Sequence, residues 1–169
     1  MQPSWHFFWS GPFSQWQTCT IVLDGKSFNC AEQAMMHAKA ELFADQDAAA
    51  AILAATEPGR QKALGRTVRG FDEAIWDAHK VAIVQRISLE KFRQNKGLRR
   101  KLFQTGGAVL VEASPLDQVW GIGLDADKAK TTPPGEWPGR NLLGTILTEV
   151  KAALAAEFPD EAAMIMAES

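Results

Sequence analysis

Tyrosine is absent from this sequence of 169 residues, and only two cysteines occur, Cys19 and Cys30. Without tyrosine, every mechanism that requires a phenol as general acid or nucleophile is excluded. Two cysteines and three histidines at wide spacing match no zinc-binding pattern, so we expect no metal site. The longest apolar run, Ala48–Ala55, is too short to cross a bilayer. These absences predict a reduced, cytoplasmic protein with no membrane partner.

The sequence also lacks a surplus of either charge. Its 18 basic and 20 acidic side chains give a net charge of −2, whereas a protein that reads duplex DNA usually carries a basic surplus. Hydrophobic residues make up 46% of the chain and charged residues 22%, which excludes a disordered tail protein. A chain of this length builds a core without help from metals or disulfides.

The aromatic residues that the sequence does contain are six tryptophans and nine phenylalanines. Indole rings stack on flat ligands and donate one N–H, although core packing accounts for some of them. Trp9, Gly11 and Ser14 lie in an aromatic stretch from Trp5 to Trp16. This stretch is a candidate contact for ribose or phosphate or, about as readily, an N-terminal aromatic plug.

The residue pattern predicts a mainly α chain with a small β component, an irregular α+β domain. Asp24-Gly25 is a hairpin turn signal between the expected strands Thr18–Leu23 and Lys26–Phe28, and a buried strand is expected at Ala108–Ala113. Apolar spacing and capping residues predict helices at about Cys30–Phe43, Ala48–Thr56, Lys62–Val68, Glu73–Asn95, Leu98–Thr105 and after Asn141.

Two segments are predicted to be less regular. Ser114–Gly139, with four prolines and two tryptophans, is expected to be a long irregular loop of functional importance. Residues after Pro159 are expected to be weakly ordered. We therefore predict one domain over residues 1–158 and a C-terminal tail over residues 159–169.

Glu32 and Lys39 are seven residues apart on one predicted helix, so they share a face about 10.5 Å apart along the axis. Both can border one ligand. Asn29 followed by Glu32 also fits a capping box, which makes Glu32 a cap carboxylate and Lys39 a solvated charge. From spacing alone the capping interpretation is the more common.

Further candidates lie in loops and at helix ends. Asp117, Trp120 and Gly121 follow a predicted strand end and fit a ligand rim, or equally a loop whose Asp makes turn hydrogen bonds. Arg66 can bind a phosphate with its guanidinium, and Asn141 stands at a helix start suited to an anion. An exposed arginine and a plain helix start are the structural alternatives.

Taken in order, short motifs of the chain resemble the NADAR, or YbiA-like, family across about residues 7 to 152. The ordered set is specific, although no single motif is. It comprises Phe13-Ser14-Gln15-Trp16, Ala31-Glu32-Gln33-Ala34-Met35-Met36 with Lys39-Ala40, Leu64-Gly65-Arg66, Trp76, Lys91-Phe92, Thr105-Gly106, Leu110-Val111-Glu112-Ala113-Ser114-Pro115, Asp117, Trp120-Gly121-Ile122-Gly123 and Asn141-Leu142-Leu143-Gly144.

The resemblance implies a single YbiA-like domain that works as an N-glycosidase, without a metal or other cofactor. Some relatives hydrolyse phosphoribosylamino-pyrimidine intermediates of riboflavin biosynthesis, and we expect a ribosylated pyrimidine of this kind as the substrate. Others remove ADP-ribose from guanine bases in nucleic acid, which is the first alternative. A non-catalytic sensor of ADP-ribose or NAD is the second.

The resemblance also implies roles for particular residues. Glu32 and Lys39 fall on the family's catalytic Glu and Lys, and Asp117 remains as a further catalytic carboxylate. Ile122 replaces an Asp that many relatives carry after Trp-Gly, a departure that favours the sensor; Asp125 is a possible substitute. The predicted substrate-binding residues are Trp9, Gly11, Ser14, Arg66, Trp76, Trp120, Gly121 and Asn141.

Overall fold

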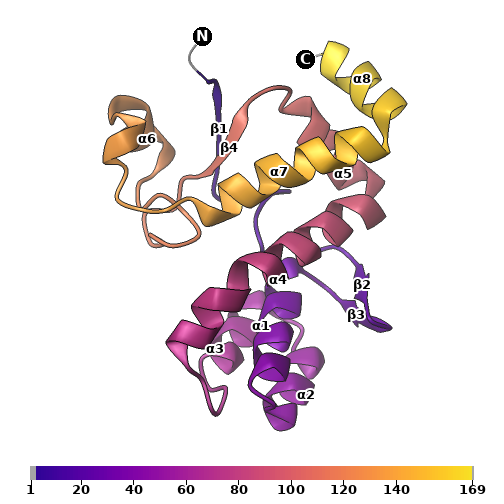
Figure 1. The fold of residues 1–169 in the computed structure, drawn as a ribbon, viewed down its shortest axis with the longest axis vertical. Helices are drawn as coiled ribbons and strands as arrows, with labels where there is room; N and C mark the ends of the chain where they lie inside the picture. The colour runs from indigo at the N-terminus through magenta and orange to yellow at the C-terminus, as the bar shows by residue number, and fades with distance from the viewer. Residues whose placement is uncertain (1–2, 169) are drawn as a thin grey trace. The chain divides into compact units, whose positions relative to one another are not determined.

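The computed structural model describes residues 3–168, which form two compact units. The central unit is residues 15–95, and the terminal unit combines the described residues up to Ser14 with those from Lys96 onward. Residues 1 and 2 of the predicted domain and residue 169 of the predicted tail lie outside the described part. The mainly helical fold with a small β component is confirmed (Figure 1).

The central unit is built around one helix. Helix α1 (Ala31–Leu42) contacts each of the other three helices and strand β3. The remaining elements of this unit are β2 (Ile21–Leu23), β3 (Lys26–Phe28), α2 (Gln46–Ala54), α3 (Pro58–Gly65) and α4 (Glu73–Gln94).

The predicted hairpin is confirmed, and its first strand is shorter than expected. Asp24 and Gly25 both have positive φ, 50° and 76°, as a type I′ turn requires. The side chain of Gln94 bonds both backbone groups of Val22, with N–H···Oε1 at 2.8 Å and Nε2–H···O at 2.9 Å. A helix side chain therefore pairs with the outer edge of β2 and fixes the hairpin on α4.

The prediction that Asn29 caps α1, with Glu32 as its capping-box partner, is wrong by one residue. Cys30 is the N-cap, and its Sγ accepts a hydrogen bond from the Gln33 N–H at 3.4 Å. Gln33 completes the box, because its Oε1 accepts from the Asn29 N–H at 2.7 Å. Cys30 and Gln33 therefore cap α1. The interpretation of Glu32 as the capping-box carboxylate does not hold.

Two buried glutamines explain the shifted cap. The Gln33 side-chain nitrogen donates to the carbonyl oxygens of Ile52 and Ala55, at 3.1 and 3.2 Å. Gln61 is fully buried, donates to Ala55 O at 2.7 Å and accepts from the Cys30 thiol at 3.1 Å. These bonds join the first turn of α1 to the carboxyl end of α2.

The other central helices match the predictions to different degrees. Asp45 caps α2 through its side chain. Helix α3 begins at Pro58, four residues before the predicted start, because proline suits the first helical turn. Helix α4 matches its predicted span closely.

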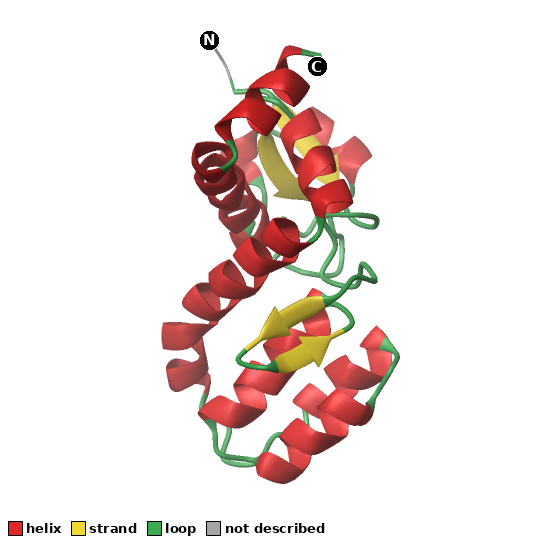
Figure 2. Cartoon of the chain, turned by 90° about the vertical axis from the view of Figure 1, so that its right-hand side faces the viewer, coloured by secondary structure: helices red, strands yellow, loops and turns green. Residues whose placement is uncertain are grey.

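The terminal unit contains a second pair of strands, which forms a two-stranded sheet of its own; both pairs are drawn in yellow in Figure 2. Strand β1 (Trp5–Phe8) pairs in parallel with β4 (Val109–Glu112), so part of the aromatic stretch is a strand that the sequence analysis missed. The predicted irregular loop includes two short helical segments. The helices of this unit are α5 (Lys96–Gln104), α6 (Ala126–Thr131), the 3-10 turn η1 (Pro134–Glu136), α7 (Leu142–Glu157) and α8 (Pro159–Ala167).

Helix α8 occupies most of the segment predicted to be a weakly ordered tail. It contacts α5 and α7 and buries Ala162 and Ile165. Arg99 of α5 pairs with Glu161 at 3.0 Å, and its guanidinium lies 4.0 Å from the Phe158 ring centroid. The degree of order of this segment in solution stays a prediction. No helix within residues 3–168 is both long and apolar enough to span a membrane.

We predict that Gly144→Ala destabilises the protein. A Cβ at this position would lie 2.2 Å from Leu110 O, a backbone atom of β4 that cannot rotate away. Overpacking of this kind costs about 1–3 kcal/mol of unfolding free energy. Gly97→Ala in α5 is the control, because no atom lies within 4 Å of its added Cβ. Urea denaturation of both variants measures the difference; equal stability would contradict the close approach of α7 to β4.

Candidate active site

Four of the predicted site residues come together in the central unit. Glu32 lies in the first turn of α1 and is only 5% exposed, and Lys39 follows two turns later, half-buried. Arg66 stands at the carboxyl end of α3, and Trp76 lies in the first turn of α4. Three helices thus supply a carboxylate, two cations and an indole.

The pKa of Lys39 depends on the charged groups around it. Burial lowers the pKa of Lys39, the positive charge of Arg66 lowers it further, and the Glu32 carboxylate opposes both effects. Its Nζ lies 5.8 Å from the Trp76 ring centroid. The Lys39 ammonium therefore interacts with Glu32, Arg66 and Trp76. A shared ligand site requires such an arrangement.

The place of Arg66 depends on a glycine. A Cβ on Gly65 would lie 2.0 Å from the Sδ of Met36, so any larger residue here would displace the Met36 side chain or widen the spacing between α3 and α1. The close spacing brings the residue after Gly65 near the face of α1 that carries Lys39. The Gly65-Arg66 pair in the sequence is therefore a packing signal as well as a candidate phosphate contact.

Sequence reasoning missed Phe71. Its ring centroid lies 4.5 Å from the Lys39 Nζ, and it makes an edge contact with Phe43 at 5.4 Å. An ammonium over an aromatic face gains about 0.5–1 kcal/mol at an exposed site. Nothing in the sequence pairs Phe71 with Lys39, because they lie on different elements 32 positions apart.

The loop that carries Phe71 is held by a buried carboxylate. Asp45 is 4% exposed and accepts hydrogen bonds from the Arg69 backbone N–H at 2.9 Å and from its Nη2 at 3.0 Å. These bonds keep the pKa of Asp45 well below its usual range. Asp45 thus caps α2 and anchors the loop just before Phe71, and this dual role is not visible from sequence spacing.

The aromatic N-terminal loop lies in the terminal unit. Trp9 is 52% exposed, Gly11 has a φ of 82°, and the Ser14 N–H closes a turn on Gly11 O at 3.0 Å. Trp9 also lines a cavity of about 490 Å³ together with Lys101 and Gln104 of α5. An exposed indole beside a cation suits a ligand that has both a ring and an anionic group.

Asp117 has the structural role that the alternative interpretation predicted. Its Oδ1 accepts from the backbone N–H groups of Val119 and Trp120, at 2.8 and 2.9 Å. Gly121 is required by packing, because its Cβ would lie 2.9 Å from Glu112 O. Asp117 therefore shapes the loop that carries Trp120 and Gly121, and its catalytic role stays a prediction.

Asn141 joins this loop to β4. It occupies the N-cap position of α7 without a side-chain cap bond, and its φ of 52° is left-handed. Its Oδ1 accepts from Glu112 N at 3.0 Å, and its Nδ2 donates to Leu110 O at 3.1 Å. These contacts require an asparagine at this position without any ligand, so its substrate contact also stays a prediction.

The position after Trp120-Gly121 carries an apolar residue in place of a carboxylate. Ile122 is fully buried in an apolar cluster with Val111, Ala113 and Ala129. Asp125 caps α6 by accepting from Lys128 N at 2.9 Å. Ile122 therefore serves the core, and Asp125 already has a local role. Across residues 3–168, no group of three His, Cys, Asp or Glu side chains is placed to hold a metal ion.

Comparison with known proteins shows the family to which this chain belongs. The NADAR domain pattern matches residues 7–155, and the chain belongs to this family. It is 43% identical over 144 residues to N-glycosidase R617 of Acanthamoeba polyphaga mimivirus, covering 82% of this chain and 85% of that protein.

Two further relatives are informative. A maize protein named Riboflavin biosynthesis protein PYRR, chloroplastic, is 31% identical over 115 residues, covering 66% of this chain and 17% of the maize protein. The NMR structure of the E. coli protein YbiA superposes with a TM-score of 0.76 at 28% identity, covering 94% of this chain and 89% of that one. The fold is therefore the YbiA-like fold.

We predict that Phe71→Leu lowers the pKa of Lys39 further. Leucine keeps the apolar cover and loses the attraction of the ring for the ammonium, about 0.5–1 kcal/mol, so the pKa of Lys39 falls. NMR titration of isotope-labelled lysine measures it. Phe71→Trp, which keeps an aromatic face, is the control and leaves the pKa near the wild-type value. A leucine variant that titrates like wild type would contradict the contact.

Proposed function

We propose that this protein is an N-glycosidase that hydrolyses the C–N bond between a ribose and the nitrogen of a base. The observation that carries the proposal is the buried Glu32 within electrostatic reach of Lys39, with Arg66 and Trp76 beside them. Family membership and the printed name of the mimivirus relative support the same activity.

Cleavage of a C–N glycosidic bond builds positive charge on the anomeric carbon and the ring oxygen. A carboxylate placed beside that charge stabilises the transition state, and low exposure strengthens the interaction because less water screens it. Glu32 has this low exposure. Water adds to the anomeric carbon, the base nitrogen leaves with a proton, and Glu32 can accept the proton that water loses.

The neighbouring residues suit the two ends of a ribosylated base. Arg66 is exposed at the end of α3, and its guanidinium can bind a phosphate in two-point fashion. Trp76 offers an indole face for stacking against the leaving base. A phosphoribosylamino-pyrimidine has both features, and the maize relative named as a riboflavin biosynthesis protein supports this substrate class.

Lys39 provides a second chemical route on the same site. Its lowered pKa enlarges the neutral fraction, and a neutral amine can attack the anomeric carbon as the base departs with a proton. The ring then opens to an imine on Lys39, and water hydrolyses the imine to release the sugar and restore the lysine. This route and direct attack by water give the same products.

The resemblance to the family leaves a second candidate substrate, an ADP-ribosyl group on guanine, whose ribose–nitrogen bond is of the same kind. Parallel assays with a phosphoribosylamino-pyrimidine and with ADP-ribosyl-guanosine separate the two substrates. Calorimetric binding of ADP-ribose without turnover of either would instead indicate a sensor.

We predict that Glu32→Gln lowers kcat about 10²–10³-fold, the usual loss when one transition-state contact is removed. Glutamine keeps the size of the side chain and loses the charge. Base release, followed by chromatography, measures the effect. Glu57→Gln, at an exposed acidic residue that makes no side-chain cap bond, is the control and keeps the wild-type rate. Wild-type turnover by the Glu32 variant would remove the carboxylate from the mechanism.

We also predict that borohydride, added during turnover, reduces an imine on Lys39. Mass spectrometry of the digested protein locates the adduct, whose yield rises with pH as the lysine loses its proton. Lys39→Arg gives no adduct, and Lys62→Arg at an exposed position of α3 gives the wild-type yield. If the enzyme turns over and Lys39 carries no reduced adduct, the reaction proceeds by attack of water with Glu32 alone.

A further inference from the structure

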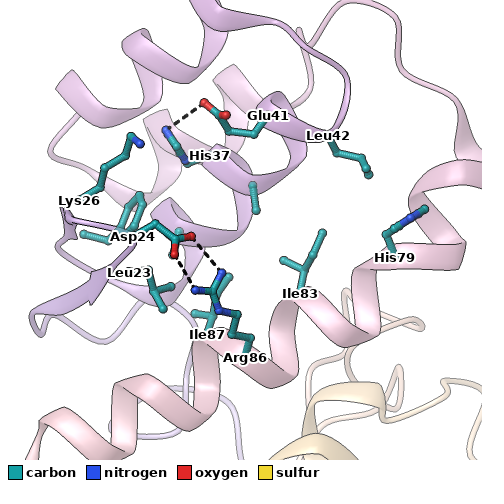
Figure 3. A pocket seen from close by; sticks show the side chains of 13 residues that line it. Leu23, Asp24, Lys26, His37, Glu41, Leu42, His79, Ile83, Arg86 and Ile87 are labelled. Atoms are coloured by element: carbon teal, nitrogen blue, oxygen red, sulfur yellow. Dashed lines mark hydrogen bonds and ion pairs between the residues drawn. The ribbon is translucent and has the colours of Figure 1, made fainter.

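A separate hollow of about 470 Å³ lies in the central unit between α1, α4 and the β2–β3 hairpin (Figure 3). Every residue that lines it belongs to this unit. At about 100° per residue, Ala34, His37 and Glu41 project from the side of α1 opposite to Glu32. The hollow is therefore on the other face of the helix that carries the candidate active site.

The hollow exists because one helix presents small side chains to the other. Ala34 and Ala38 on α1 face Ile83 and Ile87 on α4, so the two helices leave space between them. The hairpin closes one end and is fixed on α4 by the Arg86–Asp24 pair, at 2.8 and 3.0 Å. Its volume falls within the range of small-molecule sites, about 300–1,000 Å³.

The deepest polar group in this hollow is His37. It is 6% exposed, and its Nε2 lies 3.7 Å from Glu41 Oε1, beyond hydrogen-bonding distance. Among residues 3–168 no hydrogen bond reaches either ring nitrogen of His37. Burial lowers the pKa of His37, so the ring is neutral near pH 7 and offers one donor and one acceptor. Among the described residues, the fully buried side-chain atoms without a partner do not include these nitrogens, so they remain open to a ligand in the hollow.

The charges at the mouth of the hollow balance. Asp24 and Arg86 neutralise each other, and Lys26 and Glu41, both exposed, add one charge of each sign. Figure 3 shows Lys26, His37 and Glu41 near one another, while Ile83 lies along the apolar part. This distribution suits a ligand without net charge that has apolar faces and one polar edge.

We propose that this hollow binds an uncharged, planar heterocycle whose edge carries an amide, an N–H beside a carbonyl. The faces of the ring pack between Ala38 and Ile83. The N–H donates to Glu41, the carbonyl accepts from Lys26, and His37 pairs with a further ring nitrogen or N–H. Glu41 and Lys26, which both act on the charge state of His37, offer an acceptor and a donor for this edge, whereas a purely apolar ring uses neither.

The test uses two flat bicyclic probes, quinazolinone, which has the amide edge, and quinoline, which lacks it. Titration into the full-length protein, with the Ala34 methyl resonance as reporter, gives the dissociation constants. We expect saturable binding of quinazolinone that is at least about tenfold tighter than that of quinoline. Equal affinity for the two probes would overturn the amide-edge assignment, and no saturation by either would overturn the site.

Two variants locate the binding. Ala38→Leu fills the hollow and weakens quinazolinone at least about tenfold, and Glu41→Gln weakens quinazolinone and leaves quinoline unchanged. The control is Ala82→Leu, the same substitution at an exposed position of α4 that does not line the hollow. Wild-type affinity in both Ala38→Leu and Glu41→Gln, with folding confirmed by their NMR spectra, would place the probe elsewhere and refute the proposal.

Discussion

The first turn of α1 is the constraint on which the central unit depends. Gln33 and Gln61, both buried, tie this turn to the end of α2 through backbone carbonyls, and the Cys30 thiol caps it. Buried amides are costly unless their bonds are made, so this network admits one register of the helix. That register places Glu32 and Lys39 on one face and His37 and Glu41 on the other.

Lys39 shows how the site balances opposing effects. Burial and Arg66 disfavour its charged form, while Glu32 and the rings of Phe71 and Trp76 favour it. A lysine held between these influences can act as a cation that orients the carboxylate or, once neutral, as a nucleophile. The chemistry of the site therefore depends on groups contributed by α1, α3, α4 and the loop before α4.

The terminal unit illustrates how motif residues can be structural. The side-chain amide of Asn141 makes hydrogen bonds to the backbone of β4 through both its oxygen and its nitrogen. Asp117 holds a turn, and Ile122 packs in the core. Such residues shape a loop whether or not they touch a ligand. A motif match in this loop is therefore weaker evidence for catalysis than the buried carboxylate on α1.

The sequence by itself determined the mainly helical class, the Asp24-Gly25 hairpin, the span of α4 and the placement of Glu32 and Lys39 on one helix face, because these depend on local spacing and turn chemistry. It could not give the parallel strand β1 or the cap at Cys30, since each depends on partners far along the chain. The start of α3 at Pro58 was missed although it has a local signal in the proline itself. Only the tertiary structure placed Phe71 on Lys39, buried His37 without a hydrogen bond and anchored Arg69 on Asp45. The physical reason is that burial and charge are set by what packs around a side chain, and one-dimensional spacing does not contain that information.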